Sequence, residues 1–409
     1  MMSSQGVPEG YKQTKVGVIP QEWEVIIFND LKDKKVSHSI TGGPFGSNLK
    51  SEHYTKSGVR IIQLQNIGDG SFINKDFIYT NEAKATELKS CLIYPNDIIL
   101  AKMAEPVARA CIIPNFEDKF LMGSDGIRLH IDKSKYDNKF ILESINYQNF
   151  RKIAIAQSTG STRQRIGLSD LKTIPIIIPP LKEQQKIAEI LTTWDDSISC
   201  HEKLIKAKEQ LKKGLMQKLL SGEVRFSGFD EGWKEVRLEK ILKIGSGKDY
   251  KHLNKGDIPV YGTGGYMLNV DEYLYDGDSV CIGRKGTIDK PMFLNGKFWT
   301  VDTLFYTHSY KNTMPKFLYF AFLQINWKKY NEASGVPSLS KSTIETIKIK
   351  LPSLKEQQKI AQVLSTVDKE IELLKKELES LKEQKKGLMQ RLLTGEVRVK
   401  INIGEVDND

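Results

Sequence analysis

One segment occurs twice in the sequence, and this internal repeat limits the possible architecture more than any other feature. Residues 181–188 read Leu-Lys-Glu-Gln-Gln-Lys-Ile-Ala, and residues 354–361 repeat them letter for letter. Residues 212–225 return almost unchanged as residues 385–398, again 173 positions later. The two copies therefore align without a gap. Two copies are too few for a solenoid, so we expect a duplicated unit in which a variable module is followed by a shared helix.

Each copy has the apolar spacing of a coiled-coil helix. In the second copy the apolar residues recur in alternating steps of four and three, with Lys385 as the one interruption, at Ile360, Leu364, Val367, Ile371, Leu374, Leu378, Leu381, Leu388 and Leu392. The first copy has a rougher stripe at Ile187, Leu191, Trp194, Ile198, His201, Ile205, Leu215 and Leu219. A single helix would leave such a stripe in water, so we predict that the two helices pair as an antiparallel coiled coil. The alternative is two unrelated amphipathic helices, each packed on its own module.

The two copies are more alike than a coiled-coil seam requires. Each helix also has an interior glycine at the equivalent position, which costs about 1 kcal/mol relative to alanine. A close backbone approach or common descent of the duplicate would explain both glycines. We predict two equivalent docking surfaces for two copies of one partner, and the alternative is an ordinary solvated face. The residues are Lys182, Glu183, Gln184, Gln185 and Gly214 in the first copy, and Lys355, Glu356, Gln357, Gln358 and Gly387 in the second.

Composition narrows the class of protein. A length of 409 residues indicates two or three domains, and a hydrophobic content of 39% allows sizeable cores. The net charge of +10 favours a polyanionic partner. The first residues contain no apolar stretch typical of a signal peptide, and no apolar run is long enough to cross a membrane. The four cysteines are scattered without a C-x-x-C pair, which predicts free thiols in a reducing cytoplasm and argues against a zinc site.

Both modules have the pattern of short strands with an added helix. In the first module, Gly, Asn, Asp and Ser turns separate β-rich runs at residues 59–64, 77–79, 91–94, 97–101, 110–113 and 126–131. Residues 139–155 are expected to form one helix. The second module has expected strands at residues 258–261, 279–282, 292–294 and 303–307, and an expected helix at 315–325. The predicted fold class is therefore α+β.

No set of residues has the spacing of a catalytic site. Phosphate binding by a P-loop needs G-x-x-x-x-G-K-[ST], and Gly245-Ser-Gly-Lys248 lacks the earlier glycine. Gly262-Thr-Gly-Gly265 is not a dinucleotide-binding fingerprint, and no βαβ unit follows it. Asp97 precedes Lys102 in a way that superficially resembles a nuclease metal site, but we interpret Asp97 as a turn residue. We expect no catalytic residue, no bound metal and no cofactor on this chain.

Signals for nucleic-acid contact are better. Glycine-rich turns expose backbone N–H groups beside basic and amide side chains, and amides at strand ends suit base edges, whereas lysines and hydroxyls mostly hold phosphate. The candidates in the first module are Gly46, Ser47, Asn48, Lys50, Gln63, Gln65, Asn66, Lys102, Ser161, Thr162, Arg163, Gln164 and Arg165. Those in the second are Lys248, Lys251, Thr263, Tyr266, Arg284, Lys285, Ser338 and Lys341. For any one of them, the alternative is an ordinary solvated turn.

The whole chain resembles the specificity subunit of type I restriction–modification enzymes. The resemblance is carried by two variable modules, each followed by an LKEQQKIA…KKGLMQ…GEV helix. The turn Gly-Pro-Phe-Gly-Ser at 43–47, the turn Gly-Arg-Lys-Gly at 283–286 and the run Phe-Trp-Thr-Val-Asp at 298–302 also look like that family's target recognition domains. The resemblance implies a first such domain at 1–180, a long helix at 181–225, a second domain at 226–353, and a second long helix with a tail at 354–409, related by a pseudo-two-fold axis.

The resemblance also implies a function. Each domain would bind one half of a bipartite, asymmetric site in double-stranded DNA, and the paired helices would set the spacing between the halves. Two modification subunits, which use S-adenosylmethionine to methylate adenine, would dock on the repeats, and two ATP- and magnesium-dependent restriction subunits would join them. The chain itself would be a non-catalytic cytoplasmic subunit. The other hypotheses are a coiled-coil scaffold whose modules bind proteins, and a stand-alone methyltransferase or nuclease.

Overall fold

The computed structural model describes residues 7–103, 105–160 and 163–400, and the chain divides into two compact units. Unit 1 runs to residue 199 and takes in the chain again from residue 379 onward, whereas unit 2 comprises residues 200–378. Each unit therefore contains one variable module, one half of the first long helix and one half of the second.

The two repeats form two long helices, α5 (Leu181–Ser221) and α9 (Leu354–Leu393). At about 1.5 Å per residue each helix is about 60 Å long. A glycine with a positive φ follows each helix, Gly222 (76°) directly after α5 and Gly395 (75°) two residues after α9, and this backbone conformation closes helix C-termini. The predicted helices are therefore confirmed, and each ends a few residues before its repeat does.

Within each unit the two helices pack against each other with opposite directions. In unit 1, Leu191 near the beginning of α5 shares a core with Leu392 at the end of α9, and Lys385 Nζ lies 2.7 Å from Asp195 Oδ1. In unit 2, Lys208 pairs with Glu370 at 2.6 Å and Lys212 pairs with Asp368 at 2.5 Å. The residue numbers rise along one helix as they fall along the other. The antiparallel pairing is thus confirmed, and the alternative of separately packed helices is wrong.

Charged residues occupy the interruptions of the seam. In unit 1, Lys139 and Glu143 of α2 (Asn138–Asn146) join Asp195 and Lys385 in one network, with Lys139 Nζ 2.8 Å from Asp195 Oδ2. Burial acts to raise the pKa of Asp195, but the hydrogen bonds from both lysines outweigh it and lower the pKa below its ordinary value. The lysines that break the apolar pattern are therefore paired.

Two sheets make up the module of unit 1. The first has the strand order β10-β9-β12-β4, and the second has the order β5-β7-β6-β11-β8. Their bounds are β4 (Ile40–Gly42), β5 (Tyr54–Thr55), β6 (Val59–Ile62), β7 (Tyr79–Thr80), β8 (Leu92–Ile93), β9 (Ile98–Ala101), β10 (Ala110–Ile112), β11 (Phe120–Met122) and β12 (Gly126–Leu129). All neighbours are antiparallel except β6 and β11, which run parallel.

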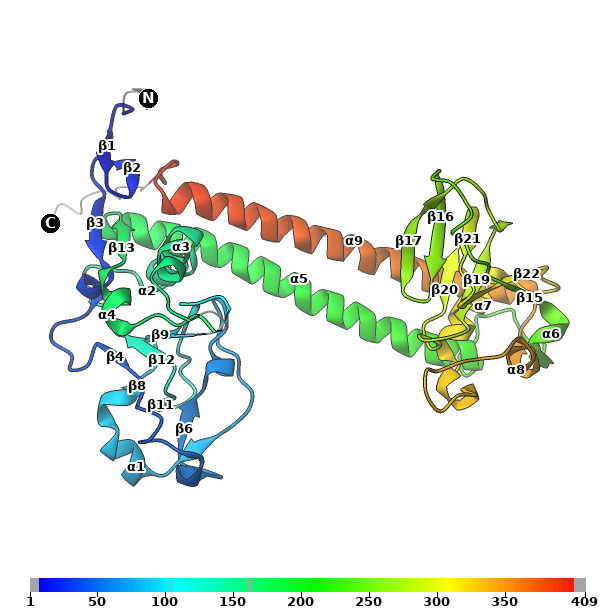
Figure 1. The fold of residues 1–409 in the computed structure, drawn as a ribbon, viewed down its shortest axis with the longest axis horizontal. Helices are drawn as coiled ribbons and strands as arrows, with labels where there is room; N and C mark the ends of the chain where they lie inside the picture. The colour runs from blue at the N-terminus through cyan, green and yellow to red at the C-terminus, as the bar shows by residue number, and fades with distance from the viewer. Residues whose placement is uncertain (1–6, 104, 161–162, 401–409) are drawn as a thin grey trace. The chain divides into compact units, whose positions relative to one another are not determined.

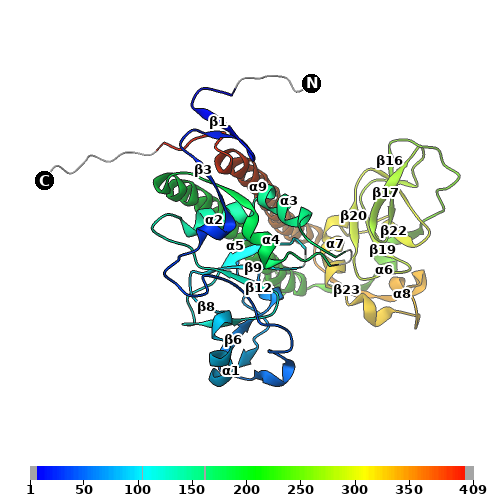
Figure 2. The ribbon, with the colours of Figure 1, turned by 60° about the vertical axis from the view of Figure 1, so that its left-hand side comes forward.

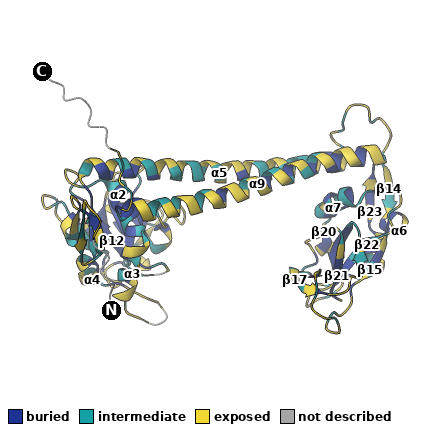
Figure 3. Cartoon of the chain, turned by 90° about the horizontal axis from the view of Figure 1, so that it is seen from above, coloured by how far each residue is buried: buried dark blue, intermediate teal, exposed yellow. Residues whose placement is uncertain are grey.

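The central strand β9 is apolar on both faces because each face covers a different core. Ile98 and Leu100 point into a core shared with the helices, whereas Ile99 and Ala101 point into a core shared with the second sheet. The strands of both modules are largely coloured as buried in Figure 3, and the outward sides of α5 and α9 carry the exposed residues.

Helices and a two-stranded ribbon complete unit 1. The ribbon pairs β3 (Glu24–Ile27) with β13 (Pro175–Ile178) and follows a hairpin of β1 (Tyr11–Thr14) and β2 (Gly17–Pro20). The helices are α1 (Glu82–Glu87), α2 (Asn138–Asn146), α3 (Gln148–Ala156) and α4 (Leu168–Thr173). Helices α2 and α3 share one core with the beginning of α5 and with strands β9 and β12 (Figures 1 and 2).

The single helix predicted over residues 139–155 is wrong, since the chain forms two helices there. Tyr147 has an extended backbone, with φ −71° and ψ 147°. The residue before it, Asn146, accepts a hydrogen bond from Ala110 N and donates one to Ala110 O, both at 2.9 Å. These bonds hold the end of α2 to the edge strand β10, so that α3 starts in a new direction.

Unit 2 repeats the plan of unit 1. One sheet has the order β15-β22-β19-β20, the other has the order β17-β16-β21-β18, and the ribbon is β14-β23. The strands are β14 (Lys234–Arg237), β15 (Lys243–Ser246), β16 (Ile258–Gly262), β17 (Gly265–Val270), β18 (Tyr275–Asp276), β19 (Ser279–Gly283), β20 (Met292–Leu294), β21 (Lys297–Thr300), β22 (Leu304–His308) and β23 (Lys348–Leu351). The helices are α6 (Leu238–Ile241), α7 (Pro315–Gln324) and α8 (Lys341–Thr346). As in unit 1, one pair of strands is parallel, β16 with β21.

Candidate nucleic-acid interface

The structure gathers several predicted contact residues of unit 1 at one place, where β4, β6 and β9 end. We call Gly43, Gln63, Lys102, Ser124 and Arg165 corner 1. Lys102 N donates to Asp125 O at 2.7 Å, and Lys102 O accepts from Ile166 N at 2.9 Å. Gly43 must be a glycine, because a Cβ there would lie 1.8 Å from the carbonyl oxygen of Gly123. The backbone therefore fixes the position of the basic residue Lys102.

Corner 1 is electrostatically suited to an anion. Burial lowers the pKa of Lys102 and the nearby Arg165 lowers it further, while Asp125 acts in the opposite direction. The Lys102 ammonium donates to Ser124 O at 3.2 Å, and Arg165 pairs with Asp125 at 2.9 Å. Two cations share one carboxylate here, so a phosphate oxygen would supply the missing negative charge.

Corner 2 occupies the equivalent place in unit 2 and consists of Gly247, Thr263, Arg284, Lys285 and Ser338. Arg284 N donates to Thr303 O at 2.7 Å, and Arg284 O accepts from Leu339 N at 2.9 Å. Lys285 and Ser338 form a β-bridge. A Cβ on Gly247 would lie 1.9 Å from the carbonyl oxygen of Val301. Thr263 lies close by, with its Oγ1 3.6 Å from the point where a Cβ on Gly286 would be.

The two corners have the same backbone frame and different side chains. The bridge between Met103 and Arg165 in corner 1 matches the bridge between Lys285 and Ser338 in corner 2. Lys102 and Arg284 are equivalent, because the backbone N–H and C=O of each residue are hydrogen-bonded in the same way in the two corners. Few identities exist at these positions, so two copies of one frame present two different sets of donors.

The other predicted contact residues are not part of the two corners. Those described as exposed are Gly46, Ser47, Asn48, Lys50, Gln65, Arg163 and Gln164 in unit 1, and Lys248, Lys251, Tyr266 and Lys341 in unit 2. Ser161 and Thr162 lie outside the described residues. Lys341 begins α8 and lies 3.8 Å from Glu345. The Tyr266 ring lies 6.3 Å from that of Tyr261.

The prediction that Asn66 reads a base is wrong, because Asn66 is fully buried. Its Oδ1 accepts from Gln63 N at 2.9 Å, and its Nδ2 donates to Lys75 O at 2.7 Å and to Ile73 O at 3.1 Å. Asn66 thus uses its amide to close the loop that follows β6. The neighbouring Gln65 Nε2 donates to Gln63 Oε1 at 2.6 Å, and both of these side chains reach the surface.

Sequence reasoning overlooked Phe45, which is 83% exposed. Its loop is anchored on both sides, by the tightly packed Gly43 and by the buried Leu49. Phe45 O accepts from Asn48 N at 2.8 Å, which forms a turn with the ring at its start. An apolar residue between two glycines was the signal for this position, because an aromatic ring on an anchored polar loop is suited to stacking on a base.

Four of the residues predicted to dock a partner are buried, so that prediction is wrong for them. Glu183 accepts from Trp23 Nε1 at 3.0 Å and from Arg398 at 2.7 and 2.9 Å. Glu356 accepts from Trp233 Nε1 at 3.1 Å and from Arg225 at 2.9 Å. We call each of these carboxylates with its two donors a clasp. In each unit the clasp joins the start of one long helix to the segment after the other.

The glutamines that follow these carboxylates, Gln184 and Gln357, are also internal. Gln184 Oε1 accepts from Asp137 N at 2.9 Å, and its Nε2 donates to Pro179 O at 2.9 Å. Gln357 makes the same two bonds, to Met314 N and to Pro352 O. The exposed remainder of the predicted docking set is Lys182, Gln185, Lys355, Gln358 and Gly387, and Gly214 is half-buried.

The helix glycines Gly214 and Gly387 do not mark a close approach within the chain. A Cβ on either would meet no atom within 4 Å. The close-approach explanation is therefore wrong for contacts inside this chain.

The described residues include no group of three or more His, Cys, Asp or Glu side chains that could hold a metal ion. Asp97 is buried and bonded to Arg128 Nε at 2.7 Å and to His130 Nδ1 at 2.6 Å, so it does more than form a turn. Burial raises the pKa of the Cys111 and Cys281 thiols to about 12. No helix within the described ranges is long and apolar enough to span a membrane.

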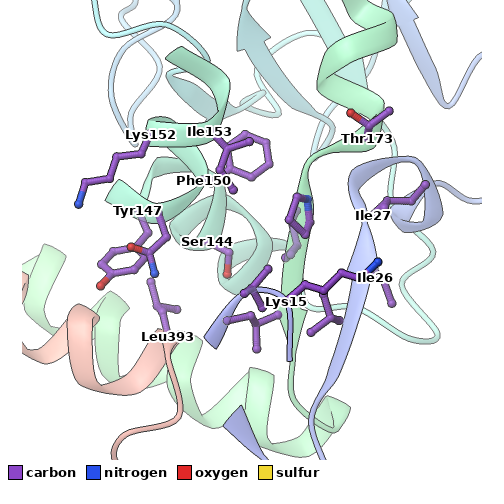
Figure 4. Close-up of a pocket in the computed structure, with 16 residues that line it drawn as sticks. Lys15, Ile26, Ile27, Ser144, Tyr147, Phe150, Lys152, Ile153, Thr173 and Leu393 are labelled. Carbon is purple, nitrogen blue, oxygen red and sulfur yellow. The ribbon is translucent and has the colours of Figure 1, made fainter. Parts of the chain in front are cut away.

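A groove of about 690 Å³ lies in unit 1 between the ribbon β3–β13 and helix α3. Figure 4 shows Ile26 and Ile27 on the ribbon side and Tyr147, Phe150 and Ile153 on the helix side. The turn of the β1–β2 hairpin contributes Lys15, and the end of α9 contributes Leu393. This groove is separate from corner 1, since the two share no residue.

Comparisons with known proteins agree with this geometry. Residues 47–210 and 230–383 match the model of the type I restriction modification DNA specificity domain. Two relatives from Methanocaldococcus jannaschii carry names of type I restriction enzyme specificity subunits. The relative named MjaX is 26% identical over 424 residues, and the relative named MjaVIII is 24% identical over 449 residues. Each alignment covers 96% of this chain and 97% of the relative.

The fold is also similar to a solved structure. The crystal structure of a type I restriction–modification system S subunit from M. genitalium superposes with a TM-score of 0.61 at 20% identity. The match covers 98% of this chain and 100% of that one.

Proposed function

The chain belongs to the family of type I restriction–modification specificity subunits, and from that membership we propose how it recognises DNA. Each unit reads one half of a bipartite, asymmetric site in double-stranded DNA. The chain recognises sequence and carries out no chemistry of its own.

The observation that supports this proposal best is the duplication of one corner with different side chains. Corner 1 presents Lys102, Arg165 and the amide Gln63, whereas corner 2 presents Arg284, Lys285 and Thr263. Lysine and hydroxyl groups hold phosphate, and arginine and amide groups can read base edges. One frame with two sets of donors is what an asymmetric site with two unlike halves requires.

We assign the spacing between the half-sites to the long helices. Both α5 and α9 are continuous from one unit into the other, and continuous paired helices are stiff. A stiff connection of fixed length would allow both units to bind together only when the half-sites have the right separation. Binding by both units on one duplex would then raise the affinity through effective concentration.

The partners we propose are two modification subunits and two restriction subunits. Lys182 and Gln185 in α5 are matched by Lys355 and Gln358 in α9, and all four are exposed. Two equivalent exposed surfaces fit two copies of one partner. S-adenosylmethionine, ATP and magnesium would be bound by those partners. We place the complex in the cytoplasm, where the four cysteines, which form no disulfide, would stay reduced.

Substitution of one arginine in each corner tests the proposal. In the complex reconstituted with its modification subunit, Arg165→Ala should relax the methylated motif in one half only, and Arg284→Ala in the other half only. Discrimination at the affected base should fall by about 5- to 150-fold, which corresponds to about 1–3 kcal/mol. Sequencing of methylated DNA reports the motif, and a variant that alters both halves would contradict the assignment.

Salt dependence separates DNA recognition from a scaffold that binds proteins. Phosphate contacts make the affinity for DNA fall steeply as the salt concentration rises. The scaffold hypothesis would be favoured if the reconstituted complex binds a protein instead of DNA and if its affinity for that protein does not change with salt.

A further inference from the structure

The ribbon that borders the groove of unit 1 differs in its outward side chains from the equivalent ribbon of unit 2. In both ribbons the two strands are antiparallel. In both, a tryptophan stands directly before the first strand, Trp23 before β3 and Trp233 before β14. The outward positions Val25, Ile27 and Ile177 of unit 1 correspond to Glu235, Arg237 and Lys350 of unit 2. One copy of the ribbon therefore has an apolar outer face and the other has a charged one.

The charged face is what a ribbon exposed to water would carry. Glu235 pairs with Lys348 at 2.8 Å, and this hydrogen bond lowers the pKa of Glu235. In unit 1, by contrast, Val25 is 37% exposed and Ile27 is 41% exposed at the edge of a hollow. Apolar side chains gathered around a groove mark a surface that another molecule covers.

The rim of the groove indicates the charge of that molecule. Lys15 and Lys152 both line the groove and are both exposed. Neither has an ion-pair partner within the described parts of the chain. Figure 4 shows the two lysines on different sides of the hollow. A segment with apolar side chains and acidic residues at its ends would match both the floor and the rim.

The groove is continuous with the repeats. Leu393, the last residue of α9, contributes to its lining beside Tyr147. The other strand of the ribbon, β13, ends at Ile178, three residues before α5 begins. A protein that docks on the exposed residues at the start of α5 would therefore reach the groove.

We propose that the modification subunit docked on unit 1 places an apolar segment with acidic flanks in this groove, and that the one docked on unit 2 has no such contact. This inference rests on the proposed function, because it requires modification subunits that bind the repeats. The two docking steps are consequently unequal, and the step on unit 1 is the tighter one.

Binding of the purified modification subunit to the full chain, measured by calorimetry and native mass spectrometry, tests the proposal. Val25→Glu with Ile27→Arg changes two exposed groove residues to the charged residues, Glu235 and Arg237, that stand at the equivalent positions of unit 2. Lys15→Glu with Lys152→Glu reverses the charge at the rim of the groove. Each pair should weaken the tighter step by about tenfold or more and leave the weaker step unchanged. Val18→Glu is the matched control, because Val18 is 42% exposed in the same unit but does not line the groove.

The outcomes are distinguishable. If the unaltered chain binds no modification subunit, both the proposed function and the groove assignment are overturned. If it binds two and neither pair of substitutions changes either step, only the groove assignment is overturned. Weakening of both steps alike, or weakening by the apolar pair without the lysine pair, also contradicts it. A second copy of this chain as the occupant would appear as self-association that the apolar pair abolishes, and would equally overturn the assignment.

Discussion

At the scale of single residues, Glu183 and Glu356 show that residues identical in the two repeats can be buried and stabilise the interior. Charged and amide residues in a helix usually face water, so the repeated Lys-Glu-Gln-Gln predicts an exposed face, either a docking surface or a solvated one. The structure instead buries the second and third letters and bonds them fully, because each carboxylate finds an arginine and a tryptophan from distant parts of the chain. A partner located 215 residues away in sequence leaves no local signal.

The helix glycines lead to a prediction at this scale. A Cβ at Gly214 or Gly387 would meet nothing, so Gly214→Ala and Gly387→Ala should each stabilise the isolated chain by about 1 kcal/mol. Denaturant unfolding followed by circular dichroism measures the gain. If instead these glycines permit close contact with docked subunits, the alanine variants should bind the modification subunit less well. Destabilisation of the isolated chain would show that the helices lack the room the structure gives them.

At the scale of elements, the clasps hold the ends of the long helices. Glu183→Ala would leave the Trp23 indole N–H and the Arg398 guanidinium without their acceptor, and should destabilise unit 1 by about 3 kcal/mol. Glu356→Ala removes the equivalent acceptor and should destabilise unit 2 by a similar amount. Hydrogen exchange with mass spectrometry localises the effect. Loss of protection spread equally over both units in either variant would contradict the assignment of one clasp to each unit.

Elements also show how far sequence patterns reach. Seam residues such as Leu364 and Leu392 predicted the long helices correctly, because a periodic apolar stripe over many turns has few other solutions. The helix at 139–155 was predicted as one piece because its apolar positions continue through Tyr147, and the bonds of Asn146 to β10 that divide it are tertiary. The short strands β4 and β11 were missed, whereas β10 and β20, which are also three residues long, were predicted.

The candidate site was predictable only in outline. Arg165 and Arg284 were identified from glycine-containing turns and Lys102 as the basic residue after a strand, and the structure brings them to the two corners. The equivalence of the segments that form the corners is indicated by the sequence, because residues 97–102 and 278–285 share the order acidic turn, strand, basic residues. The sequence does not show the backbone hydrogen bonds that complete the match, Lys102 N to Asp125 O and Arg284 N to Thr303 O.

At the scale of the whole molecule, the length of α5 and α9 acts as a ruler, because in the proposed function it sets the spacing between the half-sites. Insertion of seven residues after Ala207 in α5 and after Glu372 in α9 would keep the seam in register and lengthen both helices by about 10 Å. The spacer between the half-sites should then lengthen by about three base pairs at about 3.4 Å each, with both half-site sequences unchanged. Sequencing of methylated DNA measures the spacer. An unchanged spacer in an active variant would refute the ruler.

The central claim is that one chain carries two separate reading units for one duplex. Footprinting of the complex reconstituted with its modification subunit, on DNA that contains the methylated motif, tests it most directly. We predict two protected patches of DNA, separated by a spacer whose base edges remain accessible. When the bases of one half-site are scrambled, only the patch at that half-site should be lost at moderate salt. A single continuous patch, or loss of both patches together at every concentration of complex, would contradict the account.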